Sequence, residues 1–315
     1  MTRAAAVALV LAACAEDVPA PPGLLELGPS LPSSTAAPVD FVAAFDPRDS
    51  LVMSDGTQLV RVSGLFTGAI AGSAGVAVRP SFGFDRDGEL LVGGQTTQLV
   101  RLEPNDLFTP IGPQVPVVPF FAPIATPAGA YAILGRPPGG PLRFTPGATS
   151  WTPGPDLSRT FRAGDGTLYA ILDPAIVRLA ADDSPVTIAA CTDIGTSCAG
   201  LALAGLDGAG QLYVGARGDT AIHAIDSGGG VHSFGLPSVL QLVDVRATAA
   251  SVLVLASNPA RGGELTLWLL AGDTFQRIDA ITTSGDGFPN RLMADHSDRT
   301  YVLHAGRLDA VFLFQ

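Results

Sequence analysis

The sequence contains no lysine, so all 18 of its basic residues are arginine. Charged residues make up only 15% of the 315 positions, and the acidic ones prevail to give a net charge of -11. Neutralising the phosphates of a nucleic acid requires a basic surface, so this balance argues against nucleic acid as a partner. Low charge together with 47% hydrophobic residues is instead typical of a chain that buries a large core.

Recognisable catalytic motifs are also missing. The chain has no Gly-x-Ser-x-Gly elbow and no phosphate-binding loop. His223, His232, His296 and His304 are expected on a strand, an outer strand, a turn and a loop, without the spacing of paired metal ligands. His296 lies in an Asp-His-Ser-Asp sequence at 295–298, where other parts of the chain place a turn. We therefore predict no catalytic residues.

Long apolar runs are absent, except for one short stretch at the N-terminus. Arg3 precedes an apolar run over 4–11, which is shorter than the roughly 20 residues that cross a bilayer. A positive start, an apolar run and small residues in this order are typical of an export signal. The LAAC sequence at 11–14 resembles the lipobox of a bacterial lipoprotein precursor.

This resemblance implies that 1–13 form a cleaved lipoprotein signal peptide and that Cys14 is lipidated. The proline-rich residues that follow, up to 22, are expected to form a semi-rigid tether, and 23–315 the folded domain. Ala15 stands where an aspartate retains enterobacterial lipoproteins in the inner membrane, which favours the outer membrane. The expected location is thus the cell envelope, with membrane attachment through the lipid. The alternatives are an ordinary secretory signal with an incidental cysteine and a start codon assigned too early.

Two further cysteines, Cys191 and Cys198, lie close together in the chain. In an exported protein such a pair predicts a disulfide, with a redox pair as the alternative. Closing so small a loop contributes about 2.5 kcal/mol, so the bond is expected to fasten a loop without determining the fold. A metal site at this pair would need additional thiolate or histidine ligands nearby in the sequence.

Internal repeats indicate the fold. The sequence QLVR occurs at 58–61 and again 40 residues later at 98–101, and LFT follows each copy, at 65–67 and 107–109. Weaker copies continue along the chain, which gives seven units in all: 45–62, 84–102, 130–144, 165–179, 207–225, 250–269 and 298–313. A period of about 42 residues is typical of a solenoid turn or a propeller blade.

Each unit consists of short apolar segments separated by Gly, Asp and Pro turns, with almost no helical periodicity. The sequence therefore predicts an all-β chain, a seven-bladed β-propeller of four-stranded blades, with a six-bladed ring as the alternative. The Asp-x-x-Gly turn is expected to join the first and second strands of each blade. The seventh unit lacks a fourth strand, and we predict that residues 23–27 supply it from the N-terminus.

The Asp-x-x-Gly-x-Leu-Tyr-Val sequence at 207–214 resembles the repeats of NHL-type and gluconolactonase-like propellers. The gluconolactonase resemblance implies a central divalent metal held by carboxylates and an asparagine. Asn105, Asn258 and Asn290 all lie in loop-like contexts, however, and none of that family's ligands can be placed on this sequence. No cofactor is predicted, because the aspartates of these turns are expected to cap their own backbone.

Four arginines fall in the expected loops between second and third strands: Arg136, Arg217, Arg261 and Arg307. In a propeller these loops gather on one face, so the arginines could surround one mouth of the ring and bind a carboxylate or phosphate bidentately. The alternative is that they are four unrelated, solvated side chains.

Two classes of function follow from these features. The favoured one is a membrane-anchored, exported lipoprotein whose propeller is a non-enzymatic binding or scaffold module for a protein or an anionic envelope component. The alternative is a metal-dependent hydrolase or lyase of the gluconolactonase-like type, which rests on architecture alone.

Overall fold

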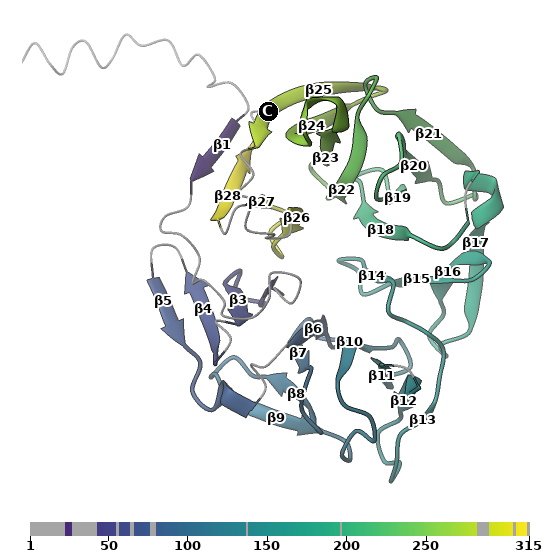
Figure 1. Cartoon of the computed structure of the whole chain (residues 1–315). Helices are drawn as coiled ribbons and strands as arrows, with labels where there is room; N and C mark the ends of the chain where they lie inside the picture. The colour runs from purple at the N-terminus through teal and green to yellow at the C-terminus, as the bar shows by residue number, and fades with distance from the viewer. Residues whose placement is uncertain are drawn as a thin grey trace, which may run out of the picture.

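The computed structural model describes residues 23–26, 43–54, 57–63, 66–75, 80–136, 138–195, 197–281, 290–304 and 307–313. Within these residues the chain forms seven four-stranded antiparallel sheets, arranged as blades around a ring (Figure 1). The predicted seven-bladed, all-β propeller is confirmed, and the six-bladed alternative is wrong. Residues 1–22, with Cys14, lie outside the described residues.

The strands of each blade follow one another outward from the centre of the ring, and blades 1 to 7 are numbered in chain order. The innermost strands are β2 (Ala43–Phe45), β6 (Ser81–Phe84), β10 (Phe120–Ala125), β14 (Thr160–Arg162), β18 (Leu201–Leu206), β22 (Gln241–Ala247) and β26 (Arg291–Ala294). The second strands are β3 (Leu51–Ser54), β7 (Leu90–Gly93), β11 (Tyr131–Gly135), β15 (Leu168–Leu172), β19 (Leu212–Ala216), β23 (Val252–Asn258) and β27 (Thr300–His304).

The third strands are β4 (Leu59–Ser63), β8 (Leu99–Leu102), β12 (Gly140–Phe144), β16 (Ala175–Leu179), β20 (Ala221–Ile225), β24 (Glu264–Ala271) and β28 (Arg307–Phe312). The outer strands are β5 (Phe66–Ala69), β9 (Phe108–Ile111), β13 (Thr152–Pro153), β17 (Pro185–Ala190), β21 (Val231–Gly235), β25 (Thr274–Ile281) and β1 (Gly23–Glu26). Three short 3-10 helices lie in the connections: η2 (Ser73–Gly75), η3 (Cys191–Ile194) and η4 (Pro259–Arg261).

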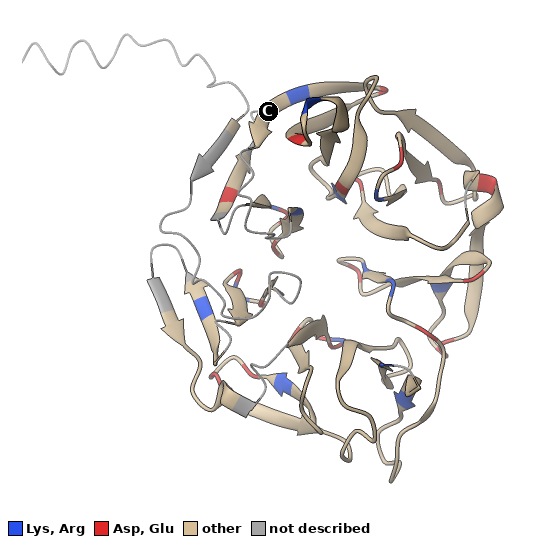
Figure 2. Ribbon diagram, viewed as in Figure 1, with Lys and Arg blue, Asp and Glu red and all other residues tan. Residues whose placement is uncertain are grey.

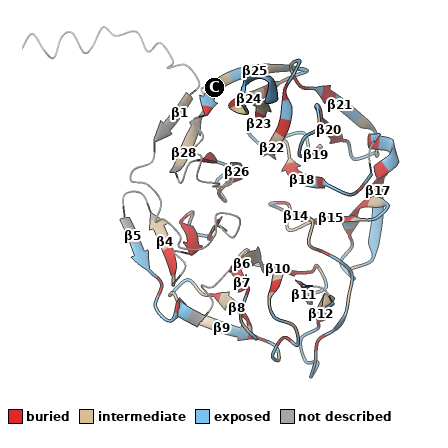
Figure 3. Ribbon diagram, in the orientation of Figure 1, coloured by how far each residue is buried: buried red, intermediate tan, exposed pale blue. Residues whose placement is uncertain are grey.

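The core lies between the blades and is centred on the second strands (Figure 3). Every residue of β3, β7, β19 and β27 is buried, because both faces of these strands pack against neighbouring blades. Strands buried on both faces are expected to be continuously apolar rather than alternating, as their Leu- and Val-rich sequences are. The outer strands carry most of the exposed positions, so the blades pack through their inner halves.

The ring is closed by the two ends of the described chain, as predicted. β1 pairs antiparallel with β28, from Gly23 opposite Phe312 to Glu26 opposite Asp309, and so completes blade 7 (Figure 1). Blade 7 also contacts blade 1 through the turn between β26 and β27. There Asp49 of blade 1 accepts hydrogen bonds from Ser297 Oγ at 2.6 Å and from the His296 N–H at 2.9 Å. Strand pairing and side-chain contacts therefore both join the last blade to the start of the chain.

The predicted disulfide is present between Cys191 and Cys198, whose Cα atoms are 5.4 Å apart. Both cysteines are buried in the connection between β17 of blade 4 and β18 of blade 5. The bond thus fastens a single connection between two blades. None of the helices in the described part of the chain is long and apolar enough to cross a membrane.

Candidate functional site

The two faces of the ring differ in the connections that they carry. The turns from first to second strands and from third to fourth strands lie on one face, here called the turn face. The loops from second to third strands, and the connections from one blade to the next, lie on the other, here called the loop face. Figure 2 shows charged residues distributed around the ring, so charge does not single out one blade as a site.

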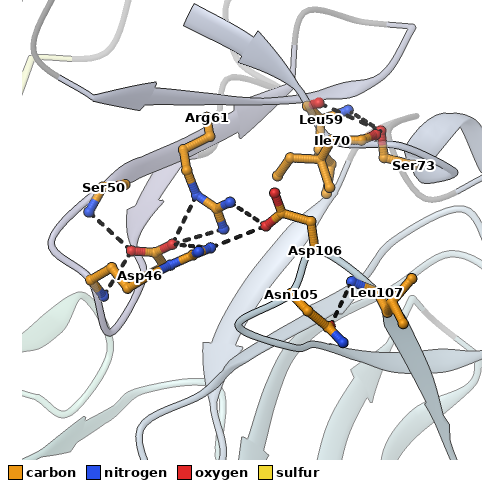
Figure 4. Close-up of polar contacts among 10 residues, drawn as sticks. Asp46, Ser50, Leu59, Arg61, Ile70, Ser73, Asn105, Asp106 and Leu107 are labelled. Carbon is orange, nitrogen blue, oxygen red and sulfur yellow. Dashed lines mark hydrogen bonds and ion pairs between the residues drawn. The ribbon is translucent and has the colours of Figure 1, made fainter. Parts of the chain in front are cut away.

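The aspartates of the turn face hold the turns together. Asp46 Oδ1 accepts hydrogen bonds from the backbone N–H groups of Arg48 and Ser50, each at 2.9 Å (Figure 4). The same pair of bonds, to the second and fourth residues after the aspartate, recurs at Asp85, Asp207 and Asp295. The sequence-based expectation that turn carboxylates cap their own backbone is confirmed at these four aspartates, whereas Asp49 accepts its hydrogen bonds from residues of blade 7.

The second carboxylate oxygen is bound as well, by a side chain from a neighbouring strand. Arg61 on β4 donates from Nε to Asp46 Oδ2 at 2.9 Å and also pairs with Asp106, which reaches over from blade 2 (Figure 4). In blade 7 the partner is Tyr301 on β27, whose hydroxyl donates to Asp295 Oδ2 at 2.8 Å. Burial, and this hydrogen bond to a carboxylate, raise the pKa of Tyr301 to about 12. These aspartates are therefore structural acceptors, and the described residues include no group of three or more His, Cys, Asp and Glu that could hold a metal.

The histidines make local contacts. His223 Nδ1 lies 2.8 Å from Ser233 Oγ, and His304 Nε2 lies 2.7 Å from Asp309 Oδ2. On the exposed side chains, His296 Nδ1 lies 3.6 Å from Asp49 Oδ1, and His232 Nε2 lies 3.9 Å from Asp273 Oδ1. Burial lowers the pKa of His223, which keeps that imidazole neutral. His304 was expected in a loop, and this expectation is wrong because His304 is the last residue of strand β27.

Three of the four arginines predicted to gather at one mouth lie in loops of the loop face. Arg136 follows β11 in blade 3, Arg217 follows β19 in blade 5, and Arg261 ends η4 in blade 6. Arg307 is instead the first residue of β28, and its side chain lies outside the described residues. Arg261 is paired with Glu264 at 3.6 Å, and Arg136 is exposed. The arginines are thus spread over several blades, and their role in binding stays a prediction.

Arg217 lines a pocket of about 250 Å³ on the loop face, where blades 5, 6 and 7 meet. The lining residues are Arg217, Gly218, Gln241, Leu242, Val243, Ser257, Gly263, Leu265 and Asn290. Leucines form the buried part of this wall, and the guanidinium, two amides and a hydroxyl provide its polar groups. Such a mixture of apolar surface and a few convergent polar groups is typical of a binding site.

The loop that carries Arg217 is fixed to the neighbouring blade. Gly218 donates its N–H to the Leu242 carbonyl, and Leu242 donates to the Asp219 carbonyl, each at 2.7 Å. Gly218 has a φ of 92°, a left-handed conformation that favours glycine at this position. The two backbone bonds hold the base of the Arg217 loop against β22, so the arginine is presented at a defined place on the pocket rim.

Sequence analysis missed a second group of arginines, on the innermost strands. Arg162, Arg246 and Arg291 lie on β14, β22 and β26, and Asp244 lies beside them on β22. Burial lowers the pKa of each of these arginines and raises the pKa of Asp244. Their signal in the sequence was a charged residue within an otherwise largely apolar first strand: Arg162 ends β14, Arg246 is the last residue but one of β22, and Arg291 begins β26.

No protein-family model matches this sequence, and no curated protein matches it significantly. Solved structures are similar in fold. Virginiamycin B lyase from Staphylococcus aureus has a TM-score of 0.64 at 11% identity, over 93% of this chain and 100% of that one. YCF48 bound to a D1 peptide has a TM-score of 0.52 at 15% identity, over 93% and 96% of the two chains.

A gluconolactonase from Xanthomonas campestris matches 92% of this chain and 94% of its own at 14% identity, but its TM-score of 0.46 is too low to support an argument. At such identities a likeness establishes the propeller fold alone. The likeness to the lyase and to YCF48 therefore supports the propeller fold.

Proposed function

We propose that this protein is a lipid-anchored protein of the cell envelope whose propeller binds an acidic protein or peptide on the loop face without catalysing a reaction. The observation that carries the proposal is the pocket whose lining includes Arg217, Gln241, Ser257 and Asn290. A guanidinium binds carboxylates through a planar fork of donors, and amide and hydroxyl groups complete such recognition.

The placement of the pocket favours a macromolecular ligand over a small buried one. It opens on the loop face, and both Arg217 and Gln241 are exposed on its rim. Val239, two residues before Gln241, exposes 64% of its surface in the same connection between blades. Arg217 and Val239 both lie in connections of the loop face, and an exposed apolar side chain on the same face as a cation suits a peptide that presents both an acidic and an apolar residue. YCF48, a propeller of similar fold, is bound to a peptide.

The anchor is the second part of the proposal. Cys14 in its LAAC sequence is the lipidation site, and the tether up to residue 22 joins it to β1, the strand that closes blade 7. The propeller is thereby held at a membrane surface, with the outer membrane favoured. Metabolic labelling with palmitate should mark the wild-type protein and not Cys14→Ala, and labelling that persists in the variant would remove this part.

Binding is tested with fluorescein-labelled acidic peptides and their matched amides, in which Gln and Asn replace Glu and Asp. Loss of a charge-assisted hydrogen bond costs about 1.5–3 kcal/mol, so the wild type should prefer the best acidic peptide by roughly 10- to 100-fold in fluorescence polarisation. Arg217→Gln should abolish this preference. Arg178→Gln, which removes an exposed arginine on β16 outside the pocket, is the matched control and should keep it.

The metal-dependent hydrolase or lyase is separated from this proposal by a thermal-shift screen with divalent metals. A native-state ligand at 100-fold its dissociation constant adds about 2.7 kcal/mol of stability. We expect no metal to raise Tm. A specific rise with one metal, combined with equal affinity of acidic and amide peptides, would reverse the proposal in favour of the enzyme.

A further inference from the structure

Arginine prevails among the charged residues of the innermost strands, although the chain as a whole is acidic. On the described innermost strands the charged residues are three arginines and one aspartate, namely Arg162, Arg246, Arg291 and Asp244. The chain has a net charge of -11, so this concentration of arginine runs against its overall composition. Charged groups in so enclosed a position are costly unless they are paired.

Asp244 neutralises these arginines only in part, because its oxygens are bound to the backbone. Oδ2 accepts the Leu292 N–H of β26 at 2.7 Å, and Oδ1 accepts the Val245 N–H at 2.9 Å. The carboxylate thus joins two innermost strands, β22 and β26. It attracts both Arg246 and Arg291, but among the described residues neither arginine forms an ion pair within 4.0 Å.

Arg246 is the most poorly satisfied of the three arginines. Its Nε is buried without a hydrogen-bond partner, and its Cζ lies 5.9 Å from the centroid of the Phe161 ring on β14. That ring attracts the cation but offers no hydrogen-bond acceptor of the strength of an oxygen. Arg162 Nε lacks a partner too, but the other two nitrogens of this guanidinium donate to the carbonyls of Gly166 and Ala125.

Arg291 resembles Arg246 in this respect. It lies on the neighbouring innermost strand, β26, and its guanidinium makes no hydrogen bond within the part of the chain that the structure describes. Arg291 and Arg246 both remain partly accessible to solvent. Two guanidinium groups around one carboxylate therefore retain unused donors at the centre of the ring.

We propose that Arg246 and Arg291 form a binding site for a small divalent oxyanion, a phosphate or a dicarboxylate, at the centre of the ring. Asp298 of the neighbouring turn also attracts Arg246, but neither carboxylate forms an ion pair with it among the described residues. A bound anion supplies the acceptors that both guanidinium groups lack. This site is separate from the Arg217 pocket, and it binds a small anion rather than a peptide.

The test is a thermal-shift titration of the full chain with inorganic phosphate, and separately with succinate, at an ionic strength held constant with sodium chloride. At 100-fold its dissociation constant, the bound anion should raise Tm by about 4 °C for a domain of this size. A response to phosphate, to succinate or to both identifies the anion. No response to either one overturns the proposal.

Three variants locate the site. Arg246→Gln and Arg291→Gln should each abolish the anion response, whereas Arg217→Gln should keep it. Because Arg246 is unsatisfied without a ligand, its replacement should not lower Tm in anion-free buffer. A response that survives in Arg246→Gln, or that is lost only in Arg217→Gln, contradicts the assignment.

A measurement on the wild type alone covers the case in which a variant does not fold. The 31P resonance of phosphate should broaden on addition of the protein and sharpen again when excess succinate competes for the same site. A 31P line that is unaffected by the protein shows that phosphate does not bind. The thermal shift with succinate then decides whether the site binds a dicarboxylate.

Discussion

Removal of the Tyr301 hydroxyl tests the reading of the turn-face aspartates as structural acceptors. Tyr301 is buried, and its hydroxyl donates to Asp295 Oδ2 at 2.8 Å, while the Asp295 side chain has 0% of its surface exposed. A hydrogen bond to a charged group contributes about 1.5–3 kcal/mol. Arg299 Nε still donates to the same oxygen at 2.6 Å, so Tyr301→Phe should lose about 1.5 kcal/mol, at the lower end of that range.

The matched control is Tyr213→Phe in blade 5. The Tyr213 hydroxyl lies 3.4 Å from Asp207 Oδ2, which is longer than a normal O–H···O hydrogen bond. We therefore expect less than about 1 kcal/mol of loss from this second variant. Urea unfolding, followed by the fluorescence of the two tryptophans, measures both changes.

The pH dependence of the same variant gives a second readout. The pKa of Tyr301 is about 12 in the native state and 10.0 in its ordinary environment, so the native state favours the protonated phenol. Its contribution to stability is complete below pH 10 and is lost as the pH rises toward 12. Because the chain has no lysine, its four tyrosines dominate titration in this range, and Tyr301→Phe should show a smaller alkaline loss than the wild type.

Two results would refute this reasoning. One is a Tyr301→Phe protein as stable as the wild type, which would mean that Asp295 does not depend on the hydroxyl. The other is an equal loss in Tyr213→Phe, which would mean that the difference in hydrogen-bond length between the two blades has no energetic consequence.

Three other changes test separate parts of the fold. Cys198→Ser opens the disulfide and should lower the free energy of unfolding by about 2.5 kcal/mol in urea, to the value of the reduced wild type. Gly83→Ala should prevent stable folding, because its Cβ would lie 1.6 Å from the Pro123 carbonyl oxygen. Circular dichroism measures this loss. The control is Gly68→Ala, whose Cβ would have no atom within 4 Å and which should change stability by less than about 1 kcal/mol. Asp49→Asn should lower Tm at neutral pH. Burial raises the pKa of Asp49, but its hydrogen bonds and the nearby positive charges outweigh burial, so the pKa is lowered overall. The difference in Tm between the variant and the wild type should therefore shrink as the pH falls below 3.8.

The number of blades and their closure could be predicted because the turn chemistry repeats. Each copy of the aspartate turn needs an acceptor before two backbone N–H groups, so the same residue types return at the same places. Residues 23–27 could be assigned to blade 7 because the last unit lacked a partner strand, and the structure has the strand at Gly23–Glu26. A closed ring leaves only short, protected strand edges, so a blade with three strands needs a fourth from elsewhere in the chain.

The binding residues could not be predicted with the same success, because strand ends and side-chain directions depend on packing. Arg307 was expected in a loop and begins β28, while His304 was expected in a loop and ends β27. Arg246 lies on a strand that alternates Val, Asp, Val and Arg, but both faces of an inner strand meet other blades. Its alternation therefore does not reveal which residues face the centre of the ring.

The sequences of the repeats differ partly because two kinds of side chain can bind the second oxygen of the turn aspartate. In blades 1 and 2 an arginine on the third strand binds the turn aspartate, and an aliphatic residue lies opposite it on the second strand. In blade 7 a tyrosine on the second strand binds the aspartate at 2.8 Å, and in blade 5 the tyrosine at the same place lies 3.4 Å from it. An alanine lies opposite each tyrosine on the third strand. The large polar side chain has changed strands while the acceptor has stayed in place. The QLVR and LYV sequences are thus alternative supports for one turn, which is why they mark blades so clearly and say so little about function.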